Sequence, residues 1–176
     1  MRSLITGGTG QLGNEWVRFL NKQSVEFIAL SSKDLDITDY NDVRRVVGNL
    51  KPNRIINCAA YTKVDQAEEE QDKAFEINGR AVRNLAHLCA EERIKLMHFS
   101  TDYVFPGTAE DMKRYANGYP EDHPVQPINV YGESKLEGEE AIRASGCDFV
   151  ILRVSWLCGR YGHNFVKTML KLGGER

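Results

Sequence analysis

Short apolar runs alternate along this chain with longer segments in which apolar residues recur at helical spacing. The runs predict buried strands over 3–6, 26–30, 54–59, 95–100 and 149–154. Between them, side chains three or four residues apart predict amphipathic helices; these sets are Leu12, Trp16, Phe19 and Leu20, then Val43, Val46, Val47 and Leu50, then Ala74, Ile77, Ala81, Leu85 and Leu88. Two more helices are predicted over 131–144 and 165–172. This alternation predicts right-handed βαβ units and an α/β fold with a Rossmann-like, doubly wound parallel sheet.

Two further features bear on where the predicted elements begin and end. Thr38 is the predicted N-cap of the second helix, and Pro52 marks where that helix has ended. The segment 103–129 interrupts the alternation and holds four of the five prolines. We expect it to be a long ordered loop, which is a kind of segment that usually carries function.

Composition limits the classes of protein to consider. The 176 residues carry a net charge of -2, which argues against a nucleic-acid binder and fits a single domain over 1–176. There is no apolar run long enough for a membrane span and no signal-peptide pattern at the N-terminus, so we expect a cytoplasmic protein that binds no membrane. The four cysteines, at 58, 89, 147 and 158, form no C-x-x-C pair, and we predict neither a metal site nor disulfides.

A glycine-rich turn follows the first predicted strand and opens the first helix. It contains Gly7, Gly8, Gly10 and Gly13, which fit a G-x-G-x-x-G spacing. Glycines permit a tight turn and the close approach of a pyrophosphate, and the free N–H groups of the helix N-terminus attract that anion. The strand–turn–helix context predicts dinucleotide binding.

The end of the second predicted strand bears on the choice of dinucleotide. It carries Ser31, Ser32 and Lys33 where an acidic residue would hold the ribose hydroxyls of NAD. Hydroxyls and an ammonium suit a 2′-phosphate, so NADP(H) is favoured and NAD(H) stays open. Asp36 is placed to accept a hydrogen bond from the adenine amino group.

A Tyr-x-x-x-Lys pair, Tyr131 and Lys135, lies on one face of the helix predicted over 131–144. We expect the nearby ammonium to lower the pKa of the phenol and to make it a usable proton donor. Thr101, with Ser100 as second choice, ends the fourth predicted strand, at the sheet edge where ligands bind. A hydroxyl there would orient a substrate carbonyl.

The chain resembles the extended short-chain dehydrogenase/reductase superfamily and, within it, the dTDP-4-dehydrorhamnose reductase family. The stretches that carry the resemblance are 5–13, 35–38, 56–65, 99–105, 129–139 and 152–157. Such an enzyme would use NAD(P)H to reduce the 4-keto group of a dTDP-4-keto-6-deoxy sugar, converting dTDP-4-dehydrorhamnose to dTDP-L-rhamnose for cell-surface polysaccharide. The implied partner is therefore a nucleotide-sugar; a homodimer is left open.

The resemblance also implies a role for each matching residue. The residues in contact with the cofactor would be Gly7, Gly10, Gln11, Leu12, Asp36, Ile37, Ala59, Ala60, Tyr61, Tyr131 and Lys135, with the lysine on the nicotinamide ribose. The catalytic residues would be Thr101, Tyr131 and Lys135. The residues facing the sugar nucleotide would be Asp102, Tyr103, Val104, Phe105 and Trp156. Asn78 either anchors a proton-relay water or lies on the surface.

Two alternatives stay open beside a reductase. A nucleotide-sugar dehydratase or epimerase is one, although a dehydratase needs an acidic pair after the Thr and only Asp102 is present. A non-catalytic NADP-binding subunit, like the regulatory subunit of methionine adenosyltransferase, is the other. Family members continue beyond the last predicted helix, so we expect the chain to be part of a longer protein, with the C-terminal substrate-binding part largely absent.

Overall fold

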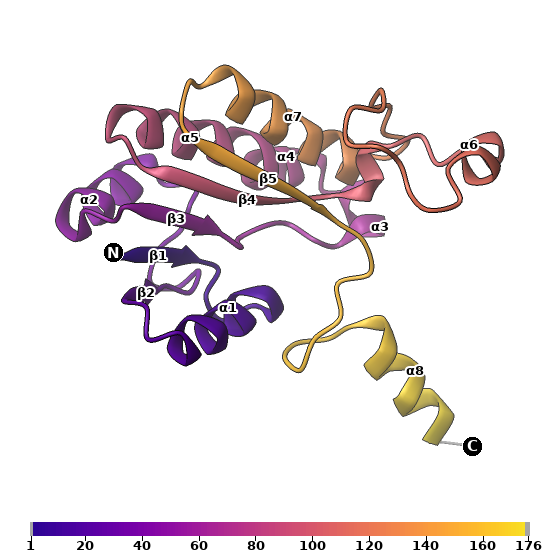
Figure 1. The fold of residues 1–176 in the computed structure, drawn as a ribbon, viewed down its shortest axis with the longest axis horizontal. Helices are drawn as coiled ribbons and strands as arrows, with labels where there is room; N and C mark the ends of the chain where they lie inside the picture. The colour runs from indigo at the N-terminus through magenta and orange to yellow at the C-terminus, as the bar shows by residue number, and fades with distance from the viewer. Residues whose placement is uncertain (1, 175–176) are drawn as a thin grey trace.

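The structure, a computed structural model, describes residues 2–174 and contains a five-stranded, fully parallel sheet (Figure 1). The strand order is β2-β1-β3-β4-β5. The strands are β1 (Ser3–Thr6), β2 (Phe27–Ala29), β3 (Arg54–Asn57), β4 (Lys95–Thr101) and β5 (Phe149–Val154). The predicted parallel α/β fold is confirmed, and β2 is shorter at both ends than its apolar run suggested.

Helices connect the strands and cover the sheet. They are α1 (Gln11–Lys22), α2 (Tyr40–Leu50), α3 (Val64–Ala67), α4 (Gln71–Phe75), the π-helix η1 (Glu76–Arg80), α5 (Ala81–Glu91), the 3₁₀ helix η2 (Asp102–Val104), α6 (Ala109–Arg114), α7 (Val130–Ala144) and α8 (Phe165–Gly174). In Figure 1, α2, α5 and α7 lie on one side of the sheet and α1 on the other.

The two faces of the sheet follow from the alternation of side chains along each strand. Leu4, Ile55 and Leu96 belong to a buried cluster with residues of α2, α5 and α7. Their neighbours Ile5 and Ile56 pack in a separate cluster with residues of α1. One residue of shift in a strand would exchange these faces, so the two cores together fix the register.

The strand order reverses between β1 and β3, because β2 lies on one side of β1 and β3 on the other. Ligands of open parallel sheets bind at such a switch point, beyond the carboxyl ends of the strands. The glycine-rich turn follows β1 and Cys58 follows β3 at this edge. The fold thus brings the first sequence motif to the expected place.

Two local predictions were wrong. The N-cap of α2 is Asp39, whose side chain accepts from the Asp42 N–H, and not Thr38. The segment 103–129 is not a continuous loop, since it contains the end of η2 and all of α6. Helix α6 is short and carries no apolar periodicity; it begins at a cap, where the Thr108 side chain accepts from the Asp111 N–H.

The long helix predicted around Ala81 forms, but a π-helical segment, η1, interrupts it. The segment packs against α7 at close range: a Cβ on Gly138 would lie 2.3 Å from the Asn78 carbonyl oxygen. Asn78 is 1% exposed, so the surface alternative for this residue is wrong. Its side chain bonds the backbone N–H and carbonyl of Tyr61 and the hydroxyl of Ser134.

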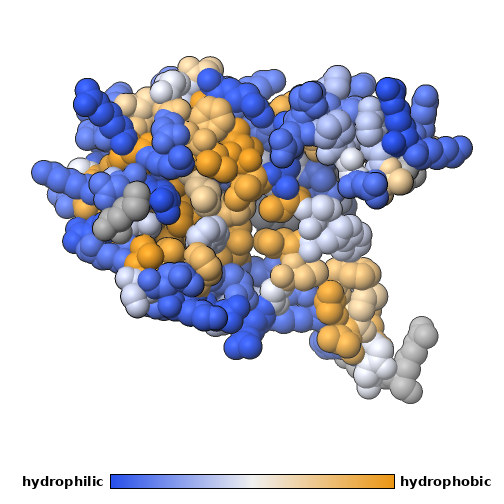
Figure 2. All heavy atoms as spheres, viewed as in Figure 1, coloured by the Kyte–Doolittle hydropathy of each residue, from blue (hydrophilic) through white to orange (hydrophobic). Residues whose placement is uncertain are grey.

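Helix α8 has no buried residue, and Figure 2 shows its apolar side chains exposed at the lower right of the molecule. The large exposed apolar residues of α8 are Phe165, Val166, Met169, Leu170 and Leu172. Within residues 2–174, no helix is both long and apolar enough to cross a membrane.

Candidate active site

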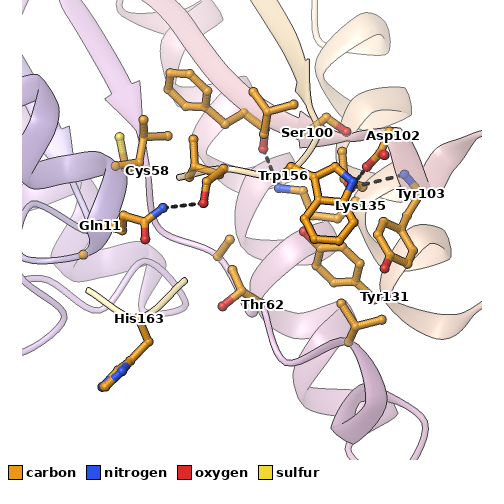
Figure 3. A pocket seen from close by; sticks show the side chains of 18 residues that line it. Gln11, Cys58, Thr62, Ser100, Asp102, Tyr103, Tyr131, Lys135, Trp156 and His163 are labelled. Carbon is orange, nitrogen blue, oxygen red and sulfur yellow. Dashed lines mark hydrogen bonds between the residues drawn. The ribbon is translucent and has the colours of Figure 1, made fainter. Parts of the chain in front are cut away.

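A cavity of about 460 Å³ opens at the carboxyl edge of the sheet (Figure 3). Figure 3 shows Gln11 and Cys58 on one side of it and Tyr103, Tyr131 and Asp102 on the other. Its lining combines the glycine turn, the ends of β4 and β5, and the first turns of α7. The predicted site residues that line it are Gly10, Gln11, Leu12, Ala60, Ser100, Thr101, Asp102, Tyr103, Tyr131, Lys135 and Trp156.

The glycine turn leaves the N-terminus of α1 free to bind an anion. Its N-cap is Gly10, which provides no side-chain cap for the first N–H groups of the helix. Gly7 has a φ of +62°, and a Cβ there would lie 2.7 Å from the Ala59 nitrogen. A side chain at Gly7 would therefore force the turn away from β3.

A second cavity, of about 320 Å³, lies on the other side of the turn. The predicted cofactor residues that line it are Gly7, Gly10, Ser32, Asp36, Ile37, Ala59 and Ala60. Gly10, Cys58 and Ala60 line both cavities, so the turn lies between two adjoining spaces. This is the arrangement that a dinucleotide with its pyrophosphate at the turn would require.

The turn after β2 places only one of its three predicted cofactor residues at the second cavity. Ser31 and Lys33 do not line the second cavity, whereas Ser32 does. The Ser31 hydroxyl and backbone N–H both donate to the Asp34 carboxylate, at 2.6 and 3.0 Å. A carboxylate therefore stands three residues beyond Ser31 and is held by it, a contact that the sequence pattern alone did not reveal.

Tyr131 and Thr101 are brought together by the packing of α7 on η2. The Asn129 side chain caps α7 by accepting from the Gly132 N–H at 2.8 Å. A Cβ on Gly132 would lie 2.4 Å from the Tyr103 carbonyl oxygen, so glycine permits this contact. The Tyr131 ring packs edge-on against Tyr103, with centroids 5.6 Å apart.

The expectation that Lys135 lowers the pKa of Tyr131 was wrong. Burial raises the pKa of the phenol, Asp102 and Tyr103 add to the rise, and the hydrogen bond with Thr101 offsets it only in part. The Lys135 Nζ instead donates to the Phe99 carbonyl at 2.6 Å and lies 3.4 Å from the His98 Nε2. The phenol is thus held in its protonated form, as a proton donor requires.

Lys135 is 1% exposed, and burial lowers the pKa of its amine to about 8, although Glu139 opposes this. Glu139 is itself buried and receives two hydrogen bonds from Arg153, at 2.9 and 2.7 Å. A buried lysine that titrates near neutral pH in a cavity is a candidate for proton chemistry.

Some predicted residues do not reach either cavity. Val104 and Phe105 are buried, at 0% and 9% exposure, and line neither space. Tyr61 is also buried, and its hydroxyl donates to Glu70 at 3.1 Å. Trp156, in contrast, is 72% exposed, lines the first cavity and has a φ of +50°, an unusual conformation for its type.

Other lining residues were not predicted. Cys58 lines both cavities, and burial raises the pKa of its thiol to about 12. Its position directly after a strand could have identified it. His163 and Leu157 come from the segment after β5, which carries no periodic signal. The Gln11 side chain ties that segment to α1 by donating to the Leu157 carbonyl at 2.7 Å.

Comparisons with a family model and with individual known proteins point to the same family. The model of the family "RmlD substrate binding domain" matches residues 1–176. The dTDP-4-dehydrorhamnose reductase of Aggregatibacter actinomycetemcomitans is 44% identical over 177 residues, which cover 99% of this chain and 58% of that protein. The spore coat polysaccharide biosynthesis protein SpsK of Bacillus subtilis is 44% identical over 169 residues, or 96% of this chain and 58% of that protein.

A solved structure is equally similar. The dTDP-4-dehydrorhamnose reductase of Bacillus anthracis, crystallised in complex with NADP, superposes with a TM-score of 0.92 and 46% identity, covering 99% of this chain and 60% of that one. The chain thus spans somewhat under two thirds of the length of these proteins. Since the family model matches throughout, the chain belongs to the RmlD substrate binding domain family.

Proposed function

We propose that residues 1–176 form the NAD(P)-binding part of a reductase that acts on the 4-keto group of a dTDP-4-keto-6-deoxy sugar, such as dTDP-4-dehydrorhamnose. The observation that carries the proposal is that Thr101, Tyr131 and Lys135 line the same cavity as the glycine turn. The relatives named as dTDP-sugar reductases support the choice of substrate class.

The residues present fit a dinucleotide cofactor. The uncapped N-terminus of α1 suits the pyrophosphate, and the cavity that contains Asp36 and Ile37 suits the adenosine half. Ser32 lines that cavity, which favours NADP(H), while Asp34 beside Ser31 leaves NAD(H) open. The structure of the Bacillus anthracis relative with NADP supports the same preference.

The glycine turn and the residues of the two cavities would hold the reduced dinucleotide, which would supply the hydride for the carbonyl carbon. Tyr131 donates its phenolic proton to the carbonyl oxygen, so the ketone becomes an alcohol. Thr101 orients that oxygen; its hydroxyl now donates to Asp102 at 3.1 Å and can rotate toward a substrate. Stabilisation of the developing oxyanion by these two hydroxyls is the main catalytic contribution.

The neighbouring side chains define where the sugar nucleotide would bind. Asp102, Tyr103 and Trp156 line the first cavity and are proposed to contact it. The Asp102 carboxylate accepts from the Ser155 hydroxyl at 2.6 Å, which fixes it beside Thr101. Roles for Val104, Phe105 and Tyr61 would have to be indirect, because these residues line neither cavity.

The reductase is tested by incubating the full-length protein with NADPH and a dTDP-4-keto-6-deoxy sugar. We expect NADPH to be oxidised in step with loss of the keto sugar. Normal NADPH binding without turnover would refute the reductase and favour a non-catalytic cofactor-binding subunit. Formation of a keto sugar from dTDP-glucose without added NADPH would instead identify a dehydratase. The homodimer and the cytoplasmic location stay predictions.

A further inference from the structure

A line of buried polar side chains runs beneath the proposed site, and the mechanism above does not use most of it. Thr6 of β1, Asn57 at the end of β3 and His98 of β4 lead to Lys135 of α7. Each of the four is at most 1% exposed. The Thr6 hydroxyl donates to the Asn57 Oδ1 at 2.6 Å, and the Asn57 Nδ2 lies 3.1 Å from the His98 Nδ1.

The orientation of the Asn57 amide is fixed by its neighbours. The Ala59 backbone N–H, which can only donate, points at the Asn57 Oδ1 at 3.3 Å. Turning the amide over would set two donors against each other, so the NH₂ group must face His98. Because an amide NH₂ donates, the His98 Nδ1 must accept and therefore carries no proton.

The remaining ring nitrogen then faces the lysine. Burial of the imidazole, which is 0% exposed, holds the pKa of His98 well below its usual value, so the ring is neutral. With Nδ1 unprotonated, the single ring proton is on Nε2, 3.4 Å from the Lys135 Nζ. A hydrogen bond across this gap requires the lysine nitrogen to accept, which only the uncharged amine can do.

We propose that His98 is a positioning residue for Lys135: its Nε2–H, directed by Asn57, holds the amine in place and favours the uncharged form. The consequence for the proposed reduction, on which this inference rests, is a lysine that gives up a proton readily. That proton is available near Tyr131, which must regain one after each turnover.

Other ionisable groups surround Lys135 and enter any pH dependence. Tyr131 and Glu139 share its helix, and Arg153 of β5 pairs with Glu139. Asp102 and Tyr103 of η2 and Cys58 after β3 line the same cavity. Arg83 of α5 contacts α7 through Glu137, at 2.8 Å. Among these, Glu139 acts on the lysine in the direction opposite to His98, since its charge favours the ammonium.

The first test reads the tautomer directly and needs no activity. In the full-length protein with ¹⁵N-labelled histidine, imidazole NMR should show the His98 Nδ1 unprotonated and Nε2 protonated, unchanged across neutral pH. The signal is identified by its loss in His98→Phe or, if that variant does not fold, by its loss in His98→Gln. A proton on Nδ1, or a titration near neutral pH, would overturn the proposal.

The second test measures the pH profile of kcat/KM for turnover. The wild type should lose activity as Lys135 deprotonates, near pH 8. His98→Phe keeps the ring volume and removes the N–H. The pH at which kcat/KM falls on the alkaline side, the alkaline limb of the profile, should therefore move up by about one pH unit, the shift expected for one lost hydrogen bond.

Leu96→Val is the matched control, since it perturbs a fully buried residue of the same strand outside the polar line. It should leave the limb where the wild type has it. An equal shift in the control, or no shift in His98→Phe, would contradict the proposal. A wild type that binds NADPH without turnover would refute the proposed function instead, and the NMR result would still decide the tautomer.

Discussion

Glu139→Gln should destabilise the protein by much more than an ordinary surface change. The Glu139 side chain is fully buried, and the two nitrogens of Arg153 contact its two oxygens at 2.9 and 2.7 Å. Arg143 adds a longer contact at 3.4 Å. Gln keeps one acceptor but loses the charge, so Arg153, which is itself only 16% exposed, is left partly unpaired.

The expected loss in the free energy of unfolding is about 2–4 kcal/mol, from one lost charge-assisted hydrogen bond and an uncompensated buried charge. Glu137→Gln is the control on the same helix, because its partner Arg83 is about half exposed and such pairs contribute no more than about 1 kcal/mol. Both variants are compared with the wild type by urea unfolding at neutral pH.

The difference in stability between the wild type and Glu139→Gln also has a predicted pH dependence. Burial raises the pKa of Glu139, but the hydrogen bonds from Arg153 and the nearby charges outweigh this, and the pKa of the folded state lies below its usual value. A group with a lowered folded pKa stabilises above its unfolded pKa of about 4.3 and stops doing so as pH falls through the folded value. The gap between wild type and Glu139→Gln should therefore shrink below about pH 4. A gap under about 1 kcal/mol at neutral pH, or one that grows in acid, would refute this reasoning.

Three further changes test the site and the packing of the helices behind it. Tyr131→Phe keeps the ring contact with Tyr103 and removes the proton donor. The kcat should therefore fall by about 10²–10⁴-fold, while the Kd for NADPH stays the same. Weaker cofactor binding in place of slower turnover would show the tyrosine to be structural. Ser31→Asp adds a second carboxylate beside Asp34. The ratio of kcat/KM for NADPH to kcat/KM for NADH should therefore fall. An unchanged ratio would contradict the proposed role of this turn in the preference for NADP(H). Gly138→Ala forces a methyl group against the Asn78 carbonyl and should cost about 1–3 kcal/mol in urea unfolding; wild-type stability would show that the helices can separate without loss.

Much of the fold was predictable because its causes are local. Buried strands such as β3 are short apolar runs, and the apolar face of α2, with Val43, Val46 and Val47, appears directly in the spacing of its residues. The glycine turn was predictable for the same reason, since strand, turn and helix follow each other within the first 22 residues. Patterns confined to one element need no knowledge of the rest of the chain.

The features that were missed depend on contacts between distant residues. The π-helical segment at Asn78 packs against Gly138, sixty residues further on in the chain, and the sequence shows only an ordinary helical pattern there. The raised pKa of Tyr131 results from burial, which the spacing to Lys135 does not reveal. The direction of the His98 proton depends on Asn57 from another strand. In each case the sequence identified the residue or its element, and the three-dimensional packing determined its chemistry.

The most direct test of the proposed function is a stoichiometric assay of the full-length protein with NADPH and dTDP-4-dehydrorhamnose. It measures NADPH consumed and sugar nucleotide reduced at C4, with Tyr131→Phe run in parallel. We predict one NADPH oxidised for each keto group reduced, and loss of both signals in the variant. NADPH binding with no reduced sugar, or equal rates in the wild type and the variant, would contradict the assignment of Tyr131 and the cavity around it to this reaction.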